Sequence, residues 1–344
     1  MNTINVLMTG AGAPGAPGII KCLLQDKRIQ LLIADADPDS VGRYLHQPFI
    51  KIPAANDPEF IHTLLHICEQ NQIHCLMPLV TKELFPLAQS VAAFEQVGTK
   101  LLLSSQESIV VANNKSACYK LLAENRIALP AFHICRTVSD IEAAASALGF
   151  PANDFCFKPS HSNGNRGFRI VSDAINQSDL LFAQKPNQTY LTYSQAIELL
   201  AAQPFPELLV SEYLPGEEYS VDCIADQGTM KLAVPRLRIR MNNGISVHGA
   251  FCQDEPIIEY CRKIISILKL HGNIGIQVKR NSSGEALLLE VNPRVQGTTV
   301  AGLGAGVNLP LLAVYQELGM SIESDLLNIR WGTKFFRYWT EVFY

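Results

Sequence analysis

Short apolar runs alternate with segments of helical periodicity in the first part of the chain. Continuous short apolar runs are typical of buried strands, whereas apolar positions spaced three and four apart indicate amphipathic helices. Strands are predicted at residues 4–8, 29–34, 75–79 and 101–104, and helices at residues 19–24 and 62–70. This alternation favours parallel pairing in a doubly wound α/β lobe, which we assign to residues 1–105.

The pattern after residue 105 is less regular. Helices are predicted at residues 108–125, 138–148, 256–270 and 310–318, the second of them capped by Ser139 and Asp140. Strands are predicted at residues 131–135, 155–159, 168–171, 208–213, 219–225, 275–279 and 286–291. The turn at residues 281–284 makes the last two strands an antiparallel hairpin. We therefore expect an α+β region, divided into a smaller lobe at 106–210 and a larger one at 211–344.

Composition excludes some classes of partner. Of the 344 residues 17% are charged, and the net charge is −4. This balance gives no bulk attraction to nucleic acid or to an anionic membrane, so neither is an expected partner. No apolar run is long enough to span a bilayer.

The cysteines indicate a reducing compartment. All nine are scattered singly, without a C-x-x-C pair, and most lie in apolar runs. Buried free thiols explain this pattern better than disulfides or a zinc site. The N-terminus lacks a basic segment, and Gly10 and Gly12 interrupt its apolar stretch, so no signal peptide is expected. We expect a cytoplasmic protein.

A glycine-rich turn follows the first predicted strand. Residues Gly10 to Gly15 match G-x-G-x-x-G, and Asp35 follows at the spacing of a dinucleotide-binding site. Pro14 and Pro17 argue against that interpretation, because proline removes N–H groups that would meet a pyrophosphate. An NAD-linked enzyme is therefore the weaker alternative to a simple tight turn, and a role for this turn in substrate binding stays open.

The predicted hairpin near the C-terminus carries the strongest chemical signal. Alternation along a strand places Glu290 and Asn292 on the same face, and Gln277 on the preceding strand can add a third oxygen. Carboxylate and amide oxygens suit Mg²⁺, with Mn²⁺ as an alternative. Arg294 lies just beyond, where a guanidinium group could contact phosphate. The competing interpretation is a hairpin whose exposed face is merely polar.

Together with motifs in the same order along the whole chain, these residues resemble the ATP-grasp superfamily, and within it single-unit relatives of the carbamoyl-phosphate synthase large subunit. The motifs are Asn113-Asn114-Lys115, Phe157-Lys158-Pro159-Ser160, residues 211–222, Glu290 to Arg294 and residues 331–339. The resemblance implies an ATP-grasp fold behind an N-terminal Rossmann-like (pre-ATP-grasp) lobe. It also implies ATP and magnesium as cofactors, with a homodimer as an expected assembly.

The resemblance assigns roles to individual residues. Lys115 and Lys158 would bind ATP phosphates, although most lysines in proteins are solvated surface groups. Arg294 and Lys158 would act catalytically, and Gln277, Glu290 and Asn292 would bind the metal. The remaining nucleotide contacts would come from Ser160, Gly164 and Gly167 in the phosphate-covering loop, from Glu212, Tyr213 and Leu214 at the adenine, and from Glu218 at the ribose.

Some assignments stay open on the sequence. The family often has adjacent glycines where this chain has Gly164-Asn165, and Arg166 is a candidate replacement contact. Glu217 competes with Glu218 because neighbours on a strand point oppositely. Arg236, Arg238 and Arg240 share a face if their segment is a strand, either as an anion-binding wall or as a solvated cationic strand. His248 is interpreted as structural.

The implied reaction is ligation. A small-molecule carboxylate attacks the γ-phosphorus of ATP, and an amine or thiol then displaces phosphate from the acyl phosphate. The chain is shorter than a complete carbamoyl-phosphate synthase and lacks the C-terminal lobe expected of a biotin carboxylase, which favours a carboxylate–amine ligase. A catalytically silent ATP-binding regulatory protein is the alternative. The identities of the acid and the amine stay open.

Overall fold

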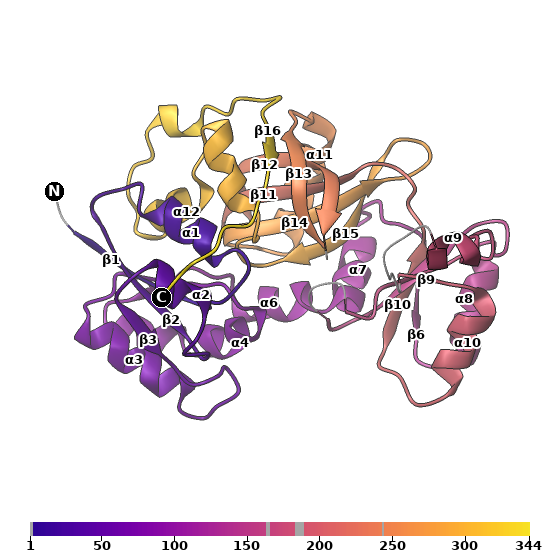
Figure 1. Ribbon diagram of the computed structural model, residues 1–344, viewed down its shortest axis with the longest axis horizontal. Helices are drawn as coiled ribbons and strands as arrows, with labels where there is room; N and C mark the ends of the chain where they lie inside the picture. Colours follow the sequence, from indigo (N-terminus) through magenta and orange to yellow (C-terminus); the bar gives the residue numbers. More distant parts are fainter. Residues whose placement is uncertain (1–2, 163–165, 183–188, 243) are drawn as a thin grey trace. The chain divides into compact units, whose positions relative to one another are not determined.

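The chain folds as two compact units, seen in a computed structural model that describes residues 3–162, 166–182, 189–242 and 244–344 (Figure 1). Unit 1 comprises Met1–Ala112, Glu218–Val278 and Glu290–Tyr344. Unit 2 comprises Asn113–Glu217 and Lys279–Leu289. Unit 2 thus contains most of the lobe predicted at 106–210, together with the tip of the C-terminal hairpin.

Unit 1 begins with a five-stranded parallel sheet, as the alternation of strands and helices predicts. Ile4 on one central strand pairs with Ile29 on its neighbour, and the register continues unbroken to Thr9 and Ala34. In spatial order the strands are β3 (Phe49–Lys51), β2 (Ile29–Asp35), β1 (Ile4–Thr9), β4 (Cys75–Pro78) and β5 (Lys100–Leu101).

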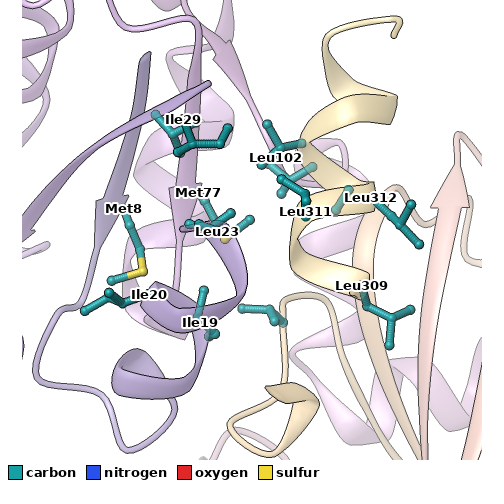
Figure 2. Close-up of a cluster of buried hydrophobic side chains, with 14 of the residues drawn as sticks. Met8, Ile19, Ile20, Leu23, Ile29, Met77, Leu102, Leu309, Leu311 and Leu312 are labelled. Carbon is teal, nitrogen blue, oxygen red and sulfur yellow. The ribbon is translucent and has the colours of Figure 1, made fainter. Parts of the chain in front are cut away.

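Helices cover both faces of this sheet because successive side chains of a strand point to opposite sides. Met8 belongs to the same apolar core as Ile19, Leu23 and Leu312 (Figure 2), whereas Leu7 belongs to the other. The first core includes α1 (Ala16–Leu23) and α12 (Leu309–Glu317). The second includes α3 (Phe60–Gln70), α4 (Thr81–Gln89), α5 (Val91–Gln96) and α6 (Gln106–Ala112).

The second sheet of unit 1 has six strands and shares the α12 core. Ile224, Val234 and Phe251 of this sheet lie in the same apolar cluster as Met8. The strand order is β15 (Ala286–Asn292), β14 (Gly272–Arg280), β11 (Glu218–Asp226), β12 (Thr229–Asn242), β13 (Ile245–Phe251) and β16 (Lys334–Phe336). The other elements of this unit are α2 (Val41–Leu45), α11 (Glu255–Ile267), η1 (Thr299–Ala305) and η2 (Ser324–Leu327).

Unit 2 contains a five-stranded mixed sheet covered on one face by two helices (Figure 1). Its strand order is β6 (Phe132–Cys135), β10 (Leu208–Glu212), β7 (Phe155–Pro159), β8 (Arg169–Val171) and β9 (Tyr190–Leu191). Ile141 and Ala196 anchor the covering helices α8 (Val138–Ala147) and α10 (Tyr193–Ala201) on Phe155 and Val210. The remaining helices are α7 (Lys115–Glu124) and α9 (Gln177–Phe182).

Two helix predictions are wrong in detail, each because of a capping side chain. The single helix predicted at 108–125 is broken between α6 and α7. Asn114 caps α7 by accepting a hydrogen bond from the Ala117 N–H at 3.0 Å, which requires a non-helical backbone at Asn114. The N-cap of α8 is Thr137 rather than Ser139 or Asp140, and Asp140 completes a capping box from the third helical position.

Candidate active site

The predicted metal ligands lie on neighbouring strands of unit 1. Glu290 and Asn292 project from β15, and the side-chain amide of Asn292 donates to Glu290 Oε1 at 2.9 Å. This contact agrees with the prediction that the two share a face. The amide therefore presents Nδ2 to the carboxylate and leaves its own oxygen, Oδ1, available to a cation.

Gln277 on β14 is held by an arginine. Arg238 Nη1 donates to Gln277 Oε1 at 3.0 Å and also pairs with Glu218 Oε1. The same guanidinium group donates through Nε to Ser246 Oγ at 3.1 Å and through Nη2 to the Gly244 carbonyl. Burial lowers the pKa of Arg238, and the Glu218 carboxylate opposes that effect. Arg238 thus fixes a predicted metal ligand and the predicted ribose ligand together.

Of the three alternating arginines on β12, Arg236 and Arg238 are not solvated, so the interpretation of a solvated cationic strand is wrong for these two. Arg236 is fully buried, and its Nη2 pairs with Asp222 Oδ2 at 2.8 Å, while Thr299 donates to the other oxygen of Asp222 at 2.7 Å. Arg238 is also buried, and only Arg240 is exposed. The buried guanidinium groups are matched by acidic partners from β11, so they serve this sheet internally rather than as an open anion-binding wall.

Arg294 lies beside the parallel sheet of unit 1. Its Nε donates to Thr81 Oγ1 at 2.9 Å, at the start of α4, and its Nη1 donates to the Val295 carbonyl at 2.9 Å. Burial lowers the pKa of Arg294, partly offset by Glu290. Within the described residues, Nη2 of Arg294 forms no hydrogen bond, which leaves it able to bind an anion near Glu290.

The donor set of Gln277, Glu290 and Asn292 fits magnesium held jointly with a nucleotide. It contains one carboxylate and two amide groups, and the amide oxygen of Gln277 keeps a second lone pair beside its bond from Arg238. Across the part of the chain that the structure describes, no group of three or more His, Cys, Asp and Glu side chains could hold a metal. Mg²⁺ usually binds through one or two carboxylates plus substrate phosphates, which is the arrangement this set permits.

The two predicted phosphate-binding lysines belong to unit 2 and are largely buried. Lys158, on β7, is 9% exposed and donates to the Leu289 carbonyl at 2.6 Å. Lys115 opens α7, is 8% exposed, and donates to the Ser162 carbonyl at 2.9 Å. Interpreting either lysine as a solvated surface group is therefore wrong. Both ammonium groups contact main-chain oxygens that a phosphate group could replace.

The predicted phosphate-covering loop is held at both ends. Ser160 at its start is 1% exposed, and its hydroxyl group is engaged inside unit 2. At its end, Gly167 has φ +77°, and a Cβ there would lie 2.6 Å from Pro159 Cγ, so glycine is required where the two ends meet. Gly164, also predicted to bind the nucleotide, lies outside the described residues.

The predicted adenine-binding segment follows β10. Leu214 is buried, and within the described ranges its backbone N–H donates no hydrogen bond and its C=O accepts none. Such an unpaired pair of groups is what the edge of an adenine base requires. The backbone of Glu212, also predicted to meet the adenine, is instead engaged, since its N–H donates to the Ala131 carbonyl at 3.0 Å; its Oε1 accepts the Ala131 N–H at 2.9 Å. The ring centroid of Tyr213 lies 4.6 Å from Lys279 Nζ.

The two candidate ribose carboxylates differ in burial. Glu217 is exposed, whereas Glu218 is half-buried and paired with Arg238. The inward direction of Glu218 agrees with its preference over Glu217. His248 stacks on Phe336 with ring centroids 3.8 Å apart, which agrees with a structural role.

The glycine-rich turn has little capacity for a dinucleotide. The Gly12 N–H donates to Asp35 Oδ2 at 2.6 Å, and the Ala13 N–H donates to the Gly10 carbonyl at 2.9 Å. A Cβ on Gly15 would lie 2.5 Å from Gly297 Cα, so this glycine permits a close backbone approach. The geometry supports the interpretation of a tight turn, because the amides that would bind a pyrophosphate are already used.

Glu83 is a buried carboxyl group that the sequence reasoning missed. It lies on α4 at the end of β1, where Thr9 donates to its Oε2 at 2.5 Å. Burial raises the pKa of Glu83 from 4.5 to about 7, and the Thr9 hydrogen bond opposes the shift. Its only sequence signal was its place in the first turn of a helix after a predicted strand.

Glu83 should make stability depend on pH. The Glu83 carboxyl group ionises near pH 4.5 in the unfolded chain and near pH 7 in the folded chain. The free energy of unfolding therefore falls as pH rises between these values. Glu83→Gln should be more stable than wild type by about 3 kcal/mol at pH 8 and equal to it at pH 4. Urea unfolding at both pH values checks this, and an equal difference at both would contradict the assignment.

Two sequence families match the chain. The family described as "ATP-grasp in the biosynthetic pathway with Ter operon" matches residues 204–334, and the "PylC-like, N-terminal domain" matches residues 6–102. The carbamoyl phosphate synthase large chain of Thermoanaerobacter pseudethanolicus is 27% identical over 234 residues, which are 65% of this chain and 20% of the relative. The match thus spans about a fifth of the length of such relatives.

Solved structures share the fold. An L-amino acid ligase from Bacillus licheniformis aligns with a TM-score of 0.64 and 14% identity, over 95% of this chain and 76% of that one. The biotin carboxylase domain of the Hydrogenobacter thermophilus 2-oxoglutarate carboxylase, solved with MgADP, ADP and bicarbonate, aligns with a TM-score of 0.68 and 13% identity, over 97% and 74%. Among the described helices none has the length and apolarity needed to cross a membrane. The chain thus combines an ATP-grasp domain, matched at residues 204–334, with a PylC-like domain, matched at residues 6–102.

Proposed function

We propose that this protein is an ATP-dependent ligase that activates a small-molecule carboxylate as an acyl phosphate and transfers the acyl group to an amine, or to a thiol. The observation that carries the proposal is the grouping in unit 1 of Glu290, Asn292 and Gln277 around Arg238. Oxygen ligands of this kind, beside the largely buried Arg294, suit phosphoryl transfer from a metal-bound nucleotide.

Lysine, main-chain and carboxylate groups have nucleotide-binding roles in this proposal. Lys115 and Lys158 exchange their main-chain partners for ATP phosphate oxygens, which neutralises charge that would repel an incoming carboxylate. The unpaired N–H and C=O of Leu214 bind the adenine edge. Glu218 accepts the ribose hydroxyl groups, in an orientation fixed by Arg238.

Gln277, Glu290 and Asn292 would hold magnesium, which would supply Lewis-acid stabilisation of charge on the phosphates. Arg294 donates through Nη2 to the transferring phosphoryl group or to the substrate carboxylate, while Thr81 fixes the guanidinium group from the other side. A substrate carboxylate oxygen forms a bond to the γ-phosphorus as the bond to the β,γ-bridging oxygen breaks, and ADP leaves. An amine then attacks the acyl carbon, and phosphate departs with the bonding electrons.

Structures with the same fold and residues of this chain support ligation over two alternatives, a silent nucleotide-binding protein and an NAD-linked enzyme. The neighbours with the same fold include an L-amino acid ligase, and another was solved with MgADP. A silent nucleotide-binding protein would not need all of Gln277, Glu290, Asn292 and Arg294, which are present here. An NAD-linked enzyme would need the amides that the turn at Gly10 to Gly15 uses internally.

The test is release of ADP and phosphate from ATP in the presence of Mg²⁺, with pools of carboxylic acids and pools of amines supplied separately and together. Turnover that requires both pools supports the ligase. Tight ATP binding without turnover in any combination would favour the silent regulatory protein. Absence of ATP binding would overturn the assignment altogether, and reduction of NAD by the same pools would favour the alternative at the glycine-rich turn.

A further inference from the structure

A buried hydrogen-bond network in unit 2 is centred on Ser160. The Ser160 hydroxyl group donates to Glu207 Oε1 at 2.9 Å, and Ser116 Oγ lies 2.5 Å from Ser160 Oγ. Ser160 is 1% exposed and Ser116 is 3% exposed, so water contributes little to either group. Each hydroxyl group has one proton, so the two serines together can donate one hydrogen bond between themselves and one to Glu207.

The backbone of Ser160 takes part in the same network. Its N–H donates to the Glu207 carbonyl at 2.9 Å, and its carbonyl accepts the Lys115 N–H at 2.9 Å. Lys115 is the first residue of α7, and its N–H would otherwise be an unsatisfied donor at a helix terminus. Ser160 thus joins the start of α7, the end of β7 and the segment before β10.

The charge of Glu207 strengthens this arrangement. Burial raises its pKa, but hydrogen bonding to the paired hydroxyl groups of Ser160 and Ser116, together with the nearby Arg136, holds the pKa of Glu207 below its usual value. The first turn of α7 contains no acidic residue of its own. The Glu207 carboxylate, linked to Ser116 of that turn through the Ser160 hydroxyl group, supplies the negative charge that a helix N-terminus favours.

The network fixes the positions of two parts of the predicted phosphate site, the Lys115 main chain and the start of the phosphate-covering loop. It fixes the main chain of Lys115, whose ammonium group donates to the Ser162 carbonyl at 2.9 Å, and it fixes the residue from which the phosphate-covering loop begins. A displacement of about 1 Å in such a group can cost about a hundredfold in rate. Nothing in the network itself needs to touch the nucleotide.

We propose that Glu207, acting through Ser160 and Ser116, is a positioning residue that sets Lys115 and the start of the loop for the phosphates of ATP. The inference rests on the proposed function, since it assumes that Lys115 binds phosphate. It assigns Ser160 a structural purpose in place of the direct nucleotide contact expected from the sequence, because both its hydroxyl group and its backbone are already engaged.

The experiment compares the affinity of two probes for the full chain, measured by calorimetric titration. One probe is the magnesium complex of a non-hydrolysable ATP analogue, and the other is adenosine, which lacks phosphates. Glu207→Gln and Ser116→Ala should each raise the Kd of the analogue about tenfold and leave the Kd of adenosine unchanged. Glu124→Gln, an exposed change at the other end of α7, is the matched control and should alter neither.

The outcomes distinguish the positioning role of Glu207 from the proposed ATP-dependent function on which it rests. If wild type binds the analogue and both variants bind it equally well, the positioning role is overturned while the ATP-dependent function stands. If both Kd values rise together with a fall in Tm, the network is only structural and the inference is also overturned. Failure of wild type to bind either probe would overturn the proposed function, and the positioning role with it.

Discussion

Replacing Glu290 with alanine should lower kcat/KM for ATP in the ligation reaction by about a thousandfold, roughly 4 kcal/mol of transition-state stabilisation. Glu290 is the one carboxylate among the three candidate metal ligands. Asn292 donates an N–H to it at 2.9 Å, so its removal also releases the amide beside it. The cation would then be held by neutral amide oxygens and by the phosphates alone.

The Mg²⁺ dependence of binding should change along with the rate. In wild type, Mg²⁺ should tighten binding of a non-hydrolysable ATP analogue, whereas in Glu290→Ala the affinity should depend little on Mg²⁺. Removing the Glu290 carboxylate should also lower the pKa of Arg294 further, since that carboxylate offsets the effect of burial on Arg294. Titration with and without Mg²⁺ measures the first effect directly, even before the acid and amine are known.

The matched control is Glu285→Ala, an exposed glutamate in the turn of the same hairpin. It should retain wild-type turnover and Mg²⁺ dependence. Equal activity of Glu290→Ala and Glu285→Ala would remove Glu290 from the metal site. Loss of activity in both would point to damage of the hairpin instead.

The strand faces of the candidate site could be predicted because they depend on local geometry. Alternation along a strand fixes the relation between Glu290 and Asn292 whatever surrounds them. The same reasoning placed Arg236, Arg238 and Arg240 on one face but could not give their burial. The ladder between β12 and β13 shifts register after Arg238, and the partners that decide burial come from β11.

The other features of the site that could not be predicted from the sequence depend on contacts between residues distant along the chain. Thr81 binds Arg294 across 213 positions, and Glu83 meets Thr9 across 74. Glu207 carries no motif, and its role follows only from the buried hydroxyl groups around Ser160. The glycine-rich turn shows the converse case, in which a local motif was present but its amides were used by Asp35 and by the turn itself.

The buried pair between Asp222 and Arg236 should be the most sensitive point in the stability of unit 1. Both side chains are 1% exposed, and Nε and Nη2 of Arg236 both reach Asp222 Oδ2. Its Nη1 is buried without a hydrogen-bond partner in the described chain, so the carboxylate is the one group that compensates the charge. Removing one partner of such a pair leaves an uncompensated buried ion.

Asp222→Ala should therefore lower the free energy of unfolding by about 3–5 kcal/mol, measured by urea denaturation. The double variant Asp222→Ala/Arg236→Met should recover most of that loss, because it removes both charges and fills the site of the guanidinium group with an apolar chain. Lys231→Ala, which breaks an exposed ion pair on the same strand, should change stability by less than about 1 kcal/mol. If Asp222→Ala behaved like Lys231→Ala, Arg236 would have to find another counter-ion or water. If the double variant were less stable than Asp222→Ala alone, the packing of the arginine, and not its charge, would be what stabilises the sheet.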